Sequence, residues 1–242
     1  MKKTLLAIAM SSALVPLAPA VAAESDVELS ANFGLVSDYR FRGTSQTQKE
    51  IAAQGGFDLS HKSGFYIGTW ASNVSSWANT NGNGMEIDGY LGYSTEIGGI
   101  GIDVGNLYYY YPGSDDFGNG KPPNTNEVYL GLSAGAFTFK TSYSTSDYFG
   151  SPDSDGTVYY NLSGEFPLSE ATSISASVGF LKAEGEAAAF EGYDYSVGIS
   201  TDLNGFSLGA SYITTSGDVN DLVYEGKKIA KGTVVVSISK SF

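Results

Sequence analysis

Apolar and polar residues alternate with a period of two along most of this chain, and this pattern restricts the chain to β-strands. In the stretches YDYSVGIS (193–200) and SISASVGF (173–180), every second residue is apolar and its neighbours are polar or glycine. Successive side chains of a strand point to opposite faces, so such stretches form strands with one apolar and one polar face. The only helical spacing is a weak one in EGEAAAFE (184–191).

Twelve segments carry the pattern. They are expected near residues 27–42, 51–61, 64–73, 85–96, 99–111, 126–134, 136–146, 157–166, 172–182, 192–202, 205–215 and 232–242. The connections alternate between short ones, such as KSG and LNG, and long ones, such as SSWANTNGNG and PGSDDFGNGKPPNTN. Short turns at one rim and long loops at the other are typical of outer-membrane barrels. We therefore predict an all-β, transmembrane antiparallel barrel of about twelve strands, with short periplasmic turns and long extracellular loops.

The two ends of the chain fit an exported protein. A basic MKK start, an apolar stretch and small residues at 20–22 predict a signal peptide over residues 1–22, cleaved after Ala22 or Ala23, with the barrel over 23–242. The chain contains no cysteine. It ends at Phe242 after an alternating strand, which resembles the signal read by the barrel-assembly machinery, although Lys240 stands where an aromatic residue is more usual.

Charge decides which face of the strands points outward. Aromatic residues gather near strand ends on the apolar face, where the girdles of a membrane barrel lie, and full charges occupy the other face. The apolar face is therefore predicted to contact lipid, with Tyr39 and Phe41 at the bilayer boundary. The predicted pore-lining residues are Asp38, Arg40, Arg42, Gln54, Asp58, Glu86, Asp88, Asp103, Glu127, Lys140, Glu165 and Asp194.

The segment SDYRFRGTSQ (37–46) places two arginines among these acids. They either neutralise neighbouring carboxylates or form a solute-contacting cluster at a constriction, since arginine suits carboxylate and phosphate groups. Few acids lie at their height on adjacent strands. Their partners are expected to come from Asp38, from across the lumen, or from the loop carrying Asp115 and Asp116, folded inward to shape the constriction.

The segments SANFGLVSDYRFRGTSQTQ and AAQGGFDLSHKSGFYIGTWASNV resemble the start of the TorF-type porin family. The shared motif S-x-Y-x-F-R-G-x-S-Q-T begins at Ser37 and ends at Thr47, and the resemblance extends over the mature chain. It implies an outer-membrane barrel that acts as a porin, and it carries no defined substrate or set of binding residues.

The motifs of other functions are weak. The one histidine, His61, lies in a short turn on the periplasmic side, so an outer-membrane hydrolase is not expected. NTNGNG (79–84) and DSDG (153–156) resemble fragments of calcium loops without the bidentate glutamate. We expect no enzyme activity, metal or cofactor.

The formal charge of -13, which becomes -15 when Lys2 and Lys3 leave with the signal peptide, disfavours nucleic acid. The expected partners are outer-membrane lipid, lipopolysaccharide and small hydrophilic solutes that diffuse through a narrow, net acidic lumen. The alternative is a non-conducting barrel with a structural or surface-interaction role.

Overall fold

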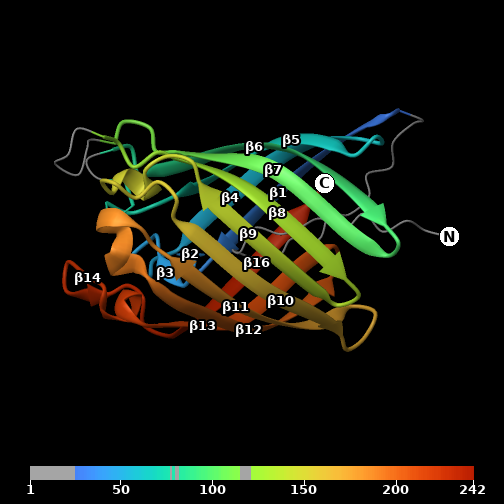
Figure 1. Ribbon diagram of the computed structural model, residues 1–242. Coiled ribbons are helices and arrows are strands. Elements are labelled where there is room, and N and C mark those ends of the chain that lie inside the picture. The colour runs from blue at the N-terminus through green and yellow to red at the C-terminus, as the bar shows by residue number, and fades with distance from the viewer. Residues whose placement is uncertain (1–24, 77, 80–81, 115–120) are drawn as a thin grey trace.

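Twelve long strands form a closed antiparallel barrel (Figure 1). The computed structural model describes residues 25–76, 78–79, 82–114 and 121–242. The order around the barrel is β1-β16-β13-β12-β11-β10-β9-β8-β7-β6-β5-β4. The barrel strands are β1 (Val27–Val36), β4 (Ala52–His61), β5 (Phe65–Asn73), β6 (Met85–Ile97), β7 (Ile100–Tyr110), β8 (Thr125–Ala134), β9 (Phe137–Ser144), β10 (Val158–Pro167), β11 (Thr172–Lys182), β12 (Gly192–Leu203), β13 (Phe206–Ser216) and β16 (Thr233–Ser241).

The first and last barrel strands close the sheet. β1 pairs with β16, where Leu35 lies opposite Ile238, and with β4, where Leu35 lies opposite Ala53. A closed ladder satisfies the backbone groups of every strand internally, which is the condition for crossing lipid with strands. The predicted fold class, strand number and antiparallel order are confirmed.

The two rims differ as predicted. Turns of a few residues join strands at one end, the short-turn rim, and long loops join them at the other, the long-loop rim (Figure 1). Eleven barrel strands end within two residues of their predicted bounds. The exception is the first, because β1 ends at Val36 and not near residue 42.

The remaining elements are short, and all lie in connections that leave the barrel strands at their long-loop ends. They are β2 (Arg40–Phe41), β3 (Thr44–Ser45), β14 (Val223–Tyr224), β15 (Lys227–Lys228) and the 3-10 helices η1 (Tyr148–Gly150), η2 (Gly185–Phe190) and η3 (Asp218–Asp221). The weak helical pattern at 184–191 corresponds to η2. No helix of the described residues is long and apolar enough to cross a membrane.

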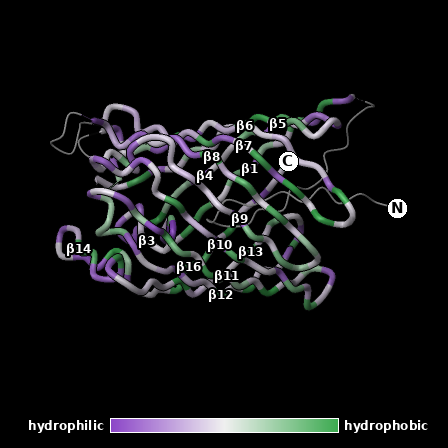
Figure 2. Tube along the Cα trace, viewed as in Figure 1, coloured by the Kyte–Doolittle hydropathy of each residue, from purple (hydrophilic) through white to green (hydrophobic). Residues whose placement is uncertain are grey.

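The outward face is apolar and open. Phe57, Val197 and Val236 are 62%, 60% and 53% exposed, and most other outward positions hold large apolar residues. Hydrophobic residues recur along the barrel strands, and hydrophilic ones gather in the long loops (Figure 2). A soluble monomer rarely exposes such a continuous apolar surface, so lipid is the environment that suits this face. At the short-turn rim the Lys240 ammonium lies over the rings of Phe206 and Phe242, so this residue of the last strand contacts aromatic groups.

The alternation along β16 provides a test of this orientation. Val236 faces outward near the middle of the strand, and its neighbour Ser237 faces inward. An arginine at a lipid-facing midplane position costs about 2–4 kcal/mol, while a lumenal one can stay hydrated. We expect Val236→Arg to lower the free energy of unfolding in lipid vesicles by this amount more than Ser237→Arg. Equal losses would contradict the assigned faces.

Candidate functional site

After Val36 the chain leaves the barrel wall and enters the lumen. Residues 37–50, here called the plug, contain the two-stranded hairpin β2–β3. Its tip has left-handed backbone at Arg42 (φ 46°) and Gly43 (φ 78°). A Cβ on Gly43 would overlap the side chain of Thr215 on β13 and approach Asp194 on β12, so glycine allows the tip to lie against these two strands.

The predicted position of two aromatic residues is therefore wrong. Tyr39 and Phe41 were expected to face lipid, but Tyr39 is only 2% exposed and its hydroxyl donates to Glu86 Oε1 at 3.2 Å. Phe41 packs edge-on against Tyr109 and Phe149 at 5.5 Å. The alternation of apolar and polar residues continues through 37–42, but the chain has already turned inward. The apolar and the polar residues of this stretch therefore both lie inside the barrel.

Short polar side chains of the motif hold the plug in shape. Ser45 Oγ donates to Asp38 Oδ1 at 2.5 Å and accepts from the backbone N–H of Lys49 at 2.8 Å. Thr47 Oγ1 accepts from the backbone N–H of Tyr39 at 3.1 Å. These bonds link the two sides of the hairpin. Residues of the motif S-x-Y-x-F-R-G-x-S-Q-T therefore stabilise the fold of the plug.

Arg40 fastens the plug to the loop that precedes β16. Its Nε donates to Asp38 Oδ2 at 2.7 Å. Its Nη1 donates to the backbone carbonyls of Gly43, Ile229 and Lys231 at 2.9, 3.0 and 3.2 Å. Arg40 is 3% exposed, and its Nη2 is buried without a hydrogen-bond partner among the described residues. This arginine therefore has a structural role at the side of the lumen nearest β1.

Arg42 crosses the lumen. Its Nη2 donates to Glu127 Oε2 on β8 at 2.8 Å, and its Nη1 donates to the hydroxyl of Tyr148 at 3.2 Å. The guanidinium carbon lies 4.3, 4.7 and 5.5 Å from the ring centres of Tyr159, Phe41 and Tyr148. Both partners of the ion pair are buried. Three rings and one carboxylate thus surround a single cation.

The carboxylate that Arg42 meets comes from the opposite wall. The sequence prediction allowed this, but favoured the loop with Asp115 and Asp116. Those two residues lie outside the described residues. Glu127 was in the predicted lumenal set and was not assigned to Arg42, because which strands face each other across a lumen does not follow from alternation.

The other predicted lumenal acids bond mainly to tyrosines. Tyr90 OH donates to Asp58 Oδ1 at 2.6 Å, and Tyr159 OH donates to Asp194 Oδ2 at 2.9 Å. The Asp103 Oδ1 accepts from Tyr66 OH at 2.6 Å. Glu127 Oε2 also accepts from Tyr109 OH at 3.3 Å. Further contacts join Tyr66 to Tyr129, and Lys140 Nζ to the Tyr129 ring at 3.9 Å.

Glycines make room for these tyrosines. Gly68 lies in register between Asp58 on β4 and Tyr90 on β6, so the Tyr90 ring crosses β5 above it. A Cβ on Gly68 would overlap both side chains, and a Cβ on Gly179 would overlap Tyr159 and Asp194 in the same way. The repeated arrangement is a tyrosine and an aspartate on strands that flank a glycine.

Three remaining predicted residues have separate positions. Glu165, near the short-turn rim, is exposed and accepts from Ser173 at 2.7 Å, and Gln54 is buried with its Nε2 3.4 Å from Ser72 Oγ. Asp88 is 2% exposed, and its Oδ1 has no hydrogen-bond partner among the described residues.

Sequence reasoning missed the lumenal tyrosines. Tyr66, Tyr90 and Tyr129 alternate onto the inward face, but no role was assigned to them. The sequence did contain a sign of this role, because each tyrosine alternates onto the same face as an acid that lies one or two strands away. Recognising it requires the register between strands, which the structure supplies.

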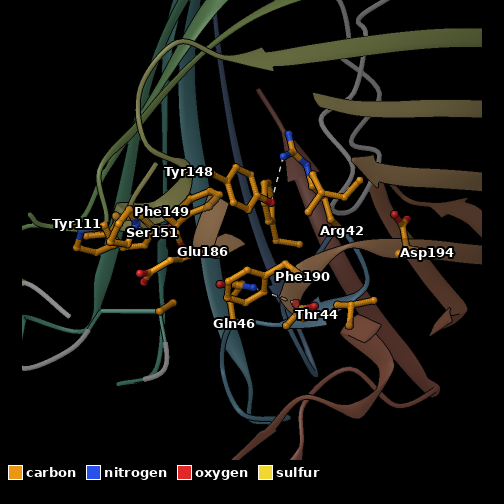
Figure 3. A pocket seen from close by; sticks show the side chains of 18 of the residues that line it. Arg42, Thr44, Gln46, Tyr111, Tyr148, Phe149, Ser151, Glu186, Phe190 and Asp194 are labelled. Atoms are coloured by element: carbon orange, nitrogen blue, oxygen red, sulfur yellow. Dashed lines mark hydrogen bonds between the residues drawn. The ribbon is translucent and has the colours of Figure 1, made fainter. Parts of the chain in front are cut away.

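A chamber lies beside the plug on the long-loop side (Figure 3). Its volume is about 490 Å3. Its lining includes the rings of Phe41, Tyr148, Phe149 and Phe190, with Arg42, Asp194 and Glu186 among the charged groups.

An ion pair links two of the long loops near the chamber. Lys121 Nζ donates to Asp147 Oδ2 at 2.5 Å, and this hydrogen bond lowers the pKa of Asp147 below its ordinary value.

The wall opposite β4–β8 is different in character. Towards the short-turn rim its inward positions are mainly half-buried serines, some of them bonded to one another, such as Ser177 to Ser196 at 2.8 Å. These are Ser173, Ser175, Ser177, Ser196, Ser200, Ser207, Ser211 and Ser237. The lumen therefore has a wall of tyrosines and acids facing a wall of hydroxyls.

A closed barrel with an apolar outer face, a polar lumen and an inward plug has the architecture of an outer-membrane β-barrel. The family model described as "Bacterial protein of unknown function (Gcw_chp)" matches residues 20–242, and the chain belongs to this family. That description assigns no function, so the resemblance to TorF-type porins stays a prediction.

No curated protein matches the chain. Among solved structures, the KdgM porin in complex with disordered oligogalacturonate has a TM-score of 0.55 at 10% identity, covering 88% of this chain and 99% of that chain. The NanC porin has a TM-score of 0.51 at 10% identity, covering 88% and 98%. At identities this low, the structural similarity shows a shared fold alone.

The glycine positions give a stability prediction. Gly179→Ala places a methyl group against Tyr159 and Asp194, whereas Gly89→Ala, on the outward face of β6, meets nothing within 4 Å. Overpacking typically costs about 1–3 kcal/mol. We expect this loss in the free energy of unfolding for Gly179→Ala and a change within about 0.5 kcal/mol for Gly89→Ala. Equal effects would contradict the packing of tyrosines over glycines.

The plug itself is tested by proteolysis. Removing one partner of a buried ion pair costs about 3–5 kcal/mol, enough to loosen the plug while the barrel ladder stays closed. We expect Arg42→Ala to accelerate tryptic cleavage after the buried Arg40 at least ~10-fold, a change worth about 1.4 kcal/mol.

The control is Lys182→Ala, which breaks an exposed ion pair with Glu184 and should leave this cleavage unchanged. Peptides are identified by mass spectrometry. Unchanged cleavage after Arg40 in Arg42→Ala would show that Arg42 does not hold the plug.

Proposed function

We propose that this protein is an outer-membrane porin that passes small hydrophilic solutes by diffusion. The observation that carries the proposal is a closed twelve-strand barrel whose inward face is polar, with a chamber on one side of the plug and half-buried serines towards the other rim. Twelve strands lie between the filled interior of eight and the open channel of sixteen, which fits a narrow path.

The long loops then face the cell exterior and the short turns the periplasm. The predicted signal peptide lies outside the described residues and supports export as a sequence pattern. The outward apolar face would contact lipid and, in the outer leaflet, lipopolysaccharide. Phe242 at the end of β16 would serve assembly into the membrane.

Charge in the lumen favours cations. Arg40 and Arg42 are each paired with an acid, Asp38 and Glu127. Among the described residues, the predicted lumenal acids without an ion pair outnumber the one such base, Lys140. These acids are Asp58, Glu86, Asp88, Asp103, Glu165 and Asp194. Fixed negative charge in a narrow passage concentrates cations.

This charge also separates the protein from one of its structural neighbours. The KdgM porin was solved with an oligogalacturonate, a polymer that carries one carboxylate on each sugar. A lumen with excess acids would repel such a chain. Neutral or cationic small solutes fit the lumen better.

The alternative is a barrel that does not conduct and has a structural or surface-interaction role. The plug favours it, because the buried Arg42–Glu127 ion pair and the hydrogen bonds from Arg40 to Ile229 and Lys231 hold residues 37–50 inside the lumen. Electrical recording separates the two functions.

In planar bilayers we expect the wild-type protein to form small, cation-preferring channels, because the unpaired lumenal acids leave net negative charge. The measurement is the reversal potential across a potassium chloride gradient, together with single-channel conductance. Arg42→Ala should raise conductance or open-channel noise and shift selectivity further towards cations. Lys182→Ala, a change at the outer end of β11, is the control and should match wild type.

An anion preference would contradict the assigned lumenal charge. The absence of channels from both wild type and Arg42→Ala, in preparations shown to be folded, would favour the non-conducting barrel.

A further inference from the structure

We propose that the site around the Arg42 guanidinium is a binding site for a guanidinium-bearing solute, which the plug's own arginine occupies in the closed state. A solute of this class would displace Arg42 and so release the tip of the plug from β8. The proposal rests on the proposed porin function and names its solute class.

The groups that bind the guanidinium come mainly from the wall and loops. Glu127 lies on β8, Tyr159 on β10 and Tyr148 in η1, whereas Arg42 and Phe41 belong to the plug. A carboxylate at 2.8 Å and ring centres at 4.3 and 5.5 Å are the contacts that recognise a planar cation. The wall and η1 therefore act as the receptor, and the plug supplies the ligand.

The receptor is held in place without Arg42. Glu127 also accepts from Tyr109 OH at 3.3 Å and from Ser144 Oγ at 3.4 Å. The hydroxyl of Tyr159 is bonded to Asp194 at 2.9 Å. Because these bonds involve only wall residues, the site should keep its form after Arg42 leaves. Such preorganisation favours an incoming ligand.

Arg42 is held in an unfavourable backbone conformation. Its φ is 46°, in the left-handed region, where a non-glycine residue is strained, and Gly43 follows at φ 78°. Withdrawal of the plug would relieve this strain. The backbone at the tip therefore does not favour the occupied state, and the side-chain contacts of Arg42 hold the tip there, while Arg40 fastens the rest of the plug to the loop before β16.

A solute from the long-loop side can reach the site. The chamber of about 490 Å3 has Arg42 and Tyr148 in its lining, so it adjoins the guanidinium (Figure 3). Asp194 and Glu186 also line it, and their carboxylates attract cations. An anionic solute has no comparable reason to enter.

Charge balance explains why the solute must be a cation. If Arg42 withdrew alone, Glu127 would remain buried without its counter-charge, which is strongly unfavourable. If another guanidinium takes its place, the ion pair and the ring contacts are kept. Exchange is therefore the route by which the plug can move without exposing an unpaired carboxylate.

The attachment of Arg42 to the plug sets the affinity expected for a free solute. A side chain attached close to its site competes at an effective concentration of about the millimolar range or above. A free solute should then bind wild type only at about millimolar concentration. Removal of the competing side chain should tighten binding at least ~10-fold.

The experiment is calorimetric titration of the full-length mature protein in detergent with l-argininamide. The matched control ligand is l-citrullinamide, in which a neutral ureido group replaces the guanidinium. We expect saturable binding of l-argininamide to wild type in the millimolar range and binding to Arg42→Ala at least ~10-fold tighter. Glu127→Gln should weaken binding at least ~10-fold, and l-citrullinamide should bind none of the proteins. Arg42→Gln provides a second displacement variant if Arg42→Ala does not fold.

Binding to Arg42→Ala and Arg42→Gln with none to wild type would overturn the proposal, because Arg42 would then be a permanent strut. Equal binding of l-citrullinamide, or no binding to any variant, would also overturn it. Bilayer recording separates this from the porin function. Binding by a protein that forms no channels would contradict the porin function and support the guanidinium-binding site. Channels without binding would contradict the binding site alone.

Discussion

The contact between Arg42 and Glu127 joins the plug to the far wall of the barrel, and the arrangement of the lumen depends on it. Two charges taken out of water are costly unless their remaining hydrogen-bonding groups are satisfied. Here Glu127 accepts from Tyr109 and Ser144 as well, and Arg42 donates to Tyr148. The pair is therefore part of a network that spans from η1 and β7–β9 to the chain that leaves β1.

The lumen differs in character on the two sides of this network. On the long-loop side lies the chamber with its aromatic lining, and towards the short-turn rim lies a wall of half-buried serines. Tyrosines bonded to Asp58, Asp103 and Asp194 cover much of the rest, and glycines in the adjacent strands give them space. A solute that passes the plug would thus move from rings and carboxylates to hydroxyl groups.

Most of the barrel could be predicted from alternation alone, because the side-chain period of a strand is two and one face needs lipid. The prediction failed where the chain turned inward. Residues 38–42 continue the alternation that ends structurally at Val36, so Tyr39 and Phe41 were assigned to lipid. The hairpin that follows the inward turn also depends on left-handed backbone at Arg42, a residue type that gives no sign of it.

The candidate site was predictable in composition and not in contacts. Arg42 and Glu127 were both placed in the lumen, but they are 85 residues apart in sequence, and their meeting depends on barrel closure. The bonds from Tyr90 to Asp58 and from Tyr159 to Asp194 depend on register across two strand pairs. Local sequence contains neither relation.

Thiol labelling tests most directly whether residues 37–50 fill the lumen. The protein has no cysteine, so Thr215→Cys and Ser211→Cys each introduce one inward thiol on β13. Thr215 is 5% exposed and lies against Gly43, whereas Ser211 is half-buried and nearer the short-turn rim. With a hydrophilic maleimide, the account predicts slow labelling at 215 and fast labelling at 211. Replacing residues 38–47 by a short glycine-serine linker should make both fast. Equal rates at the two positions in the intact protein would contradict the account.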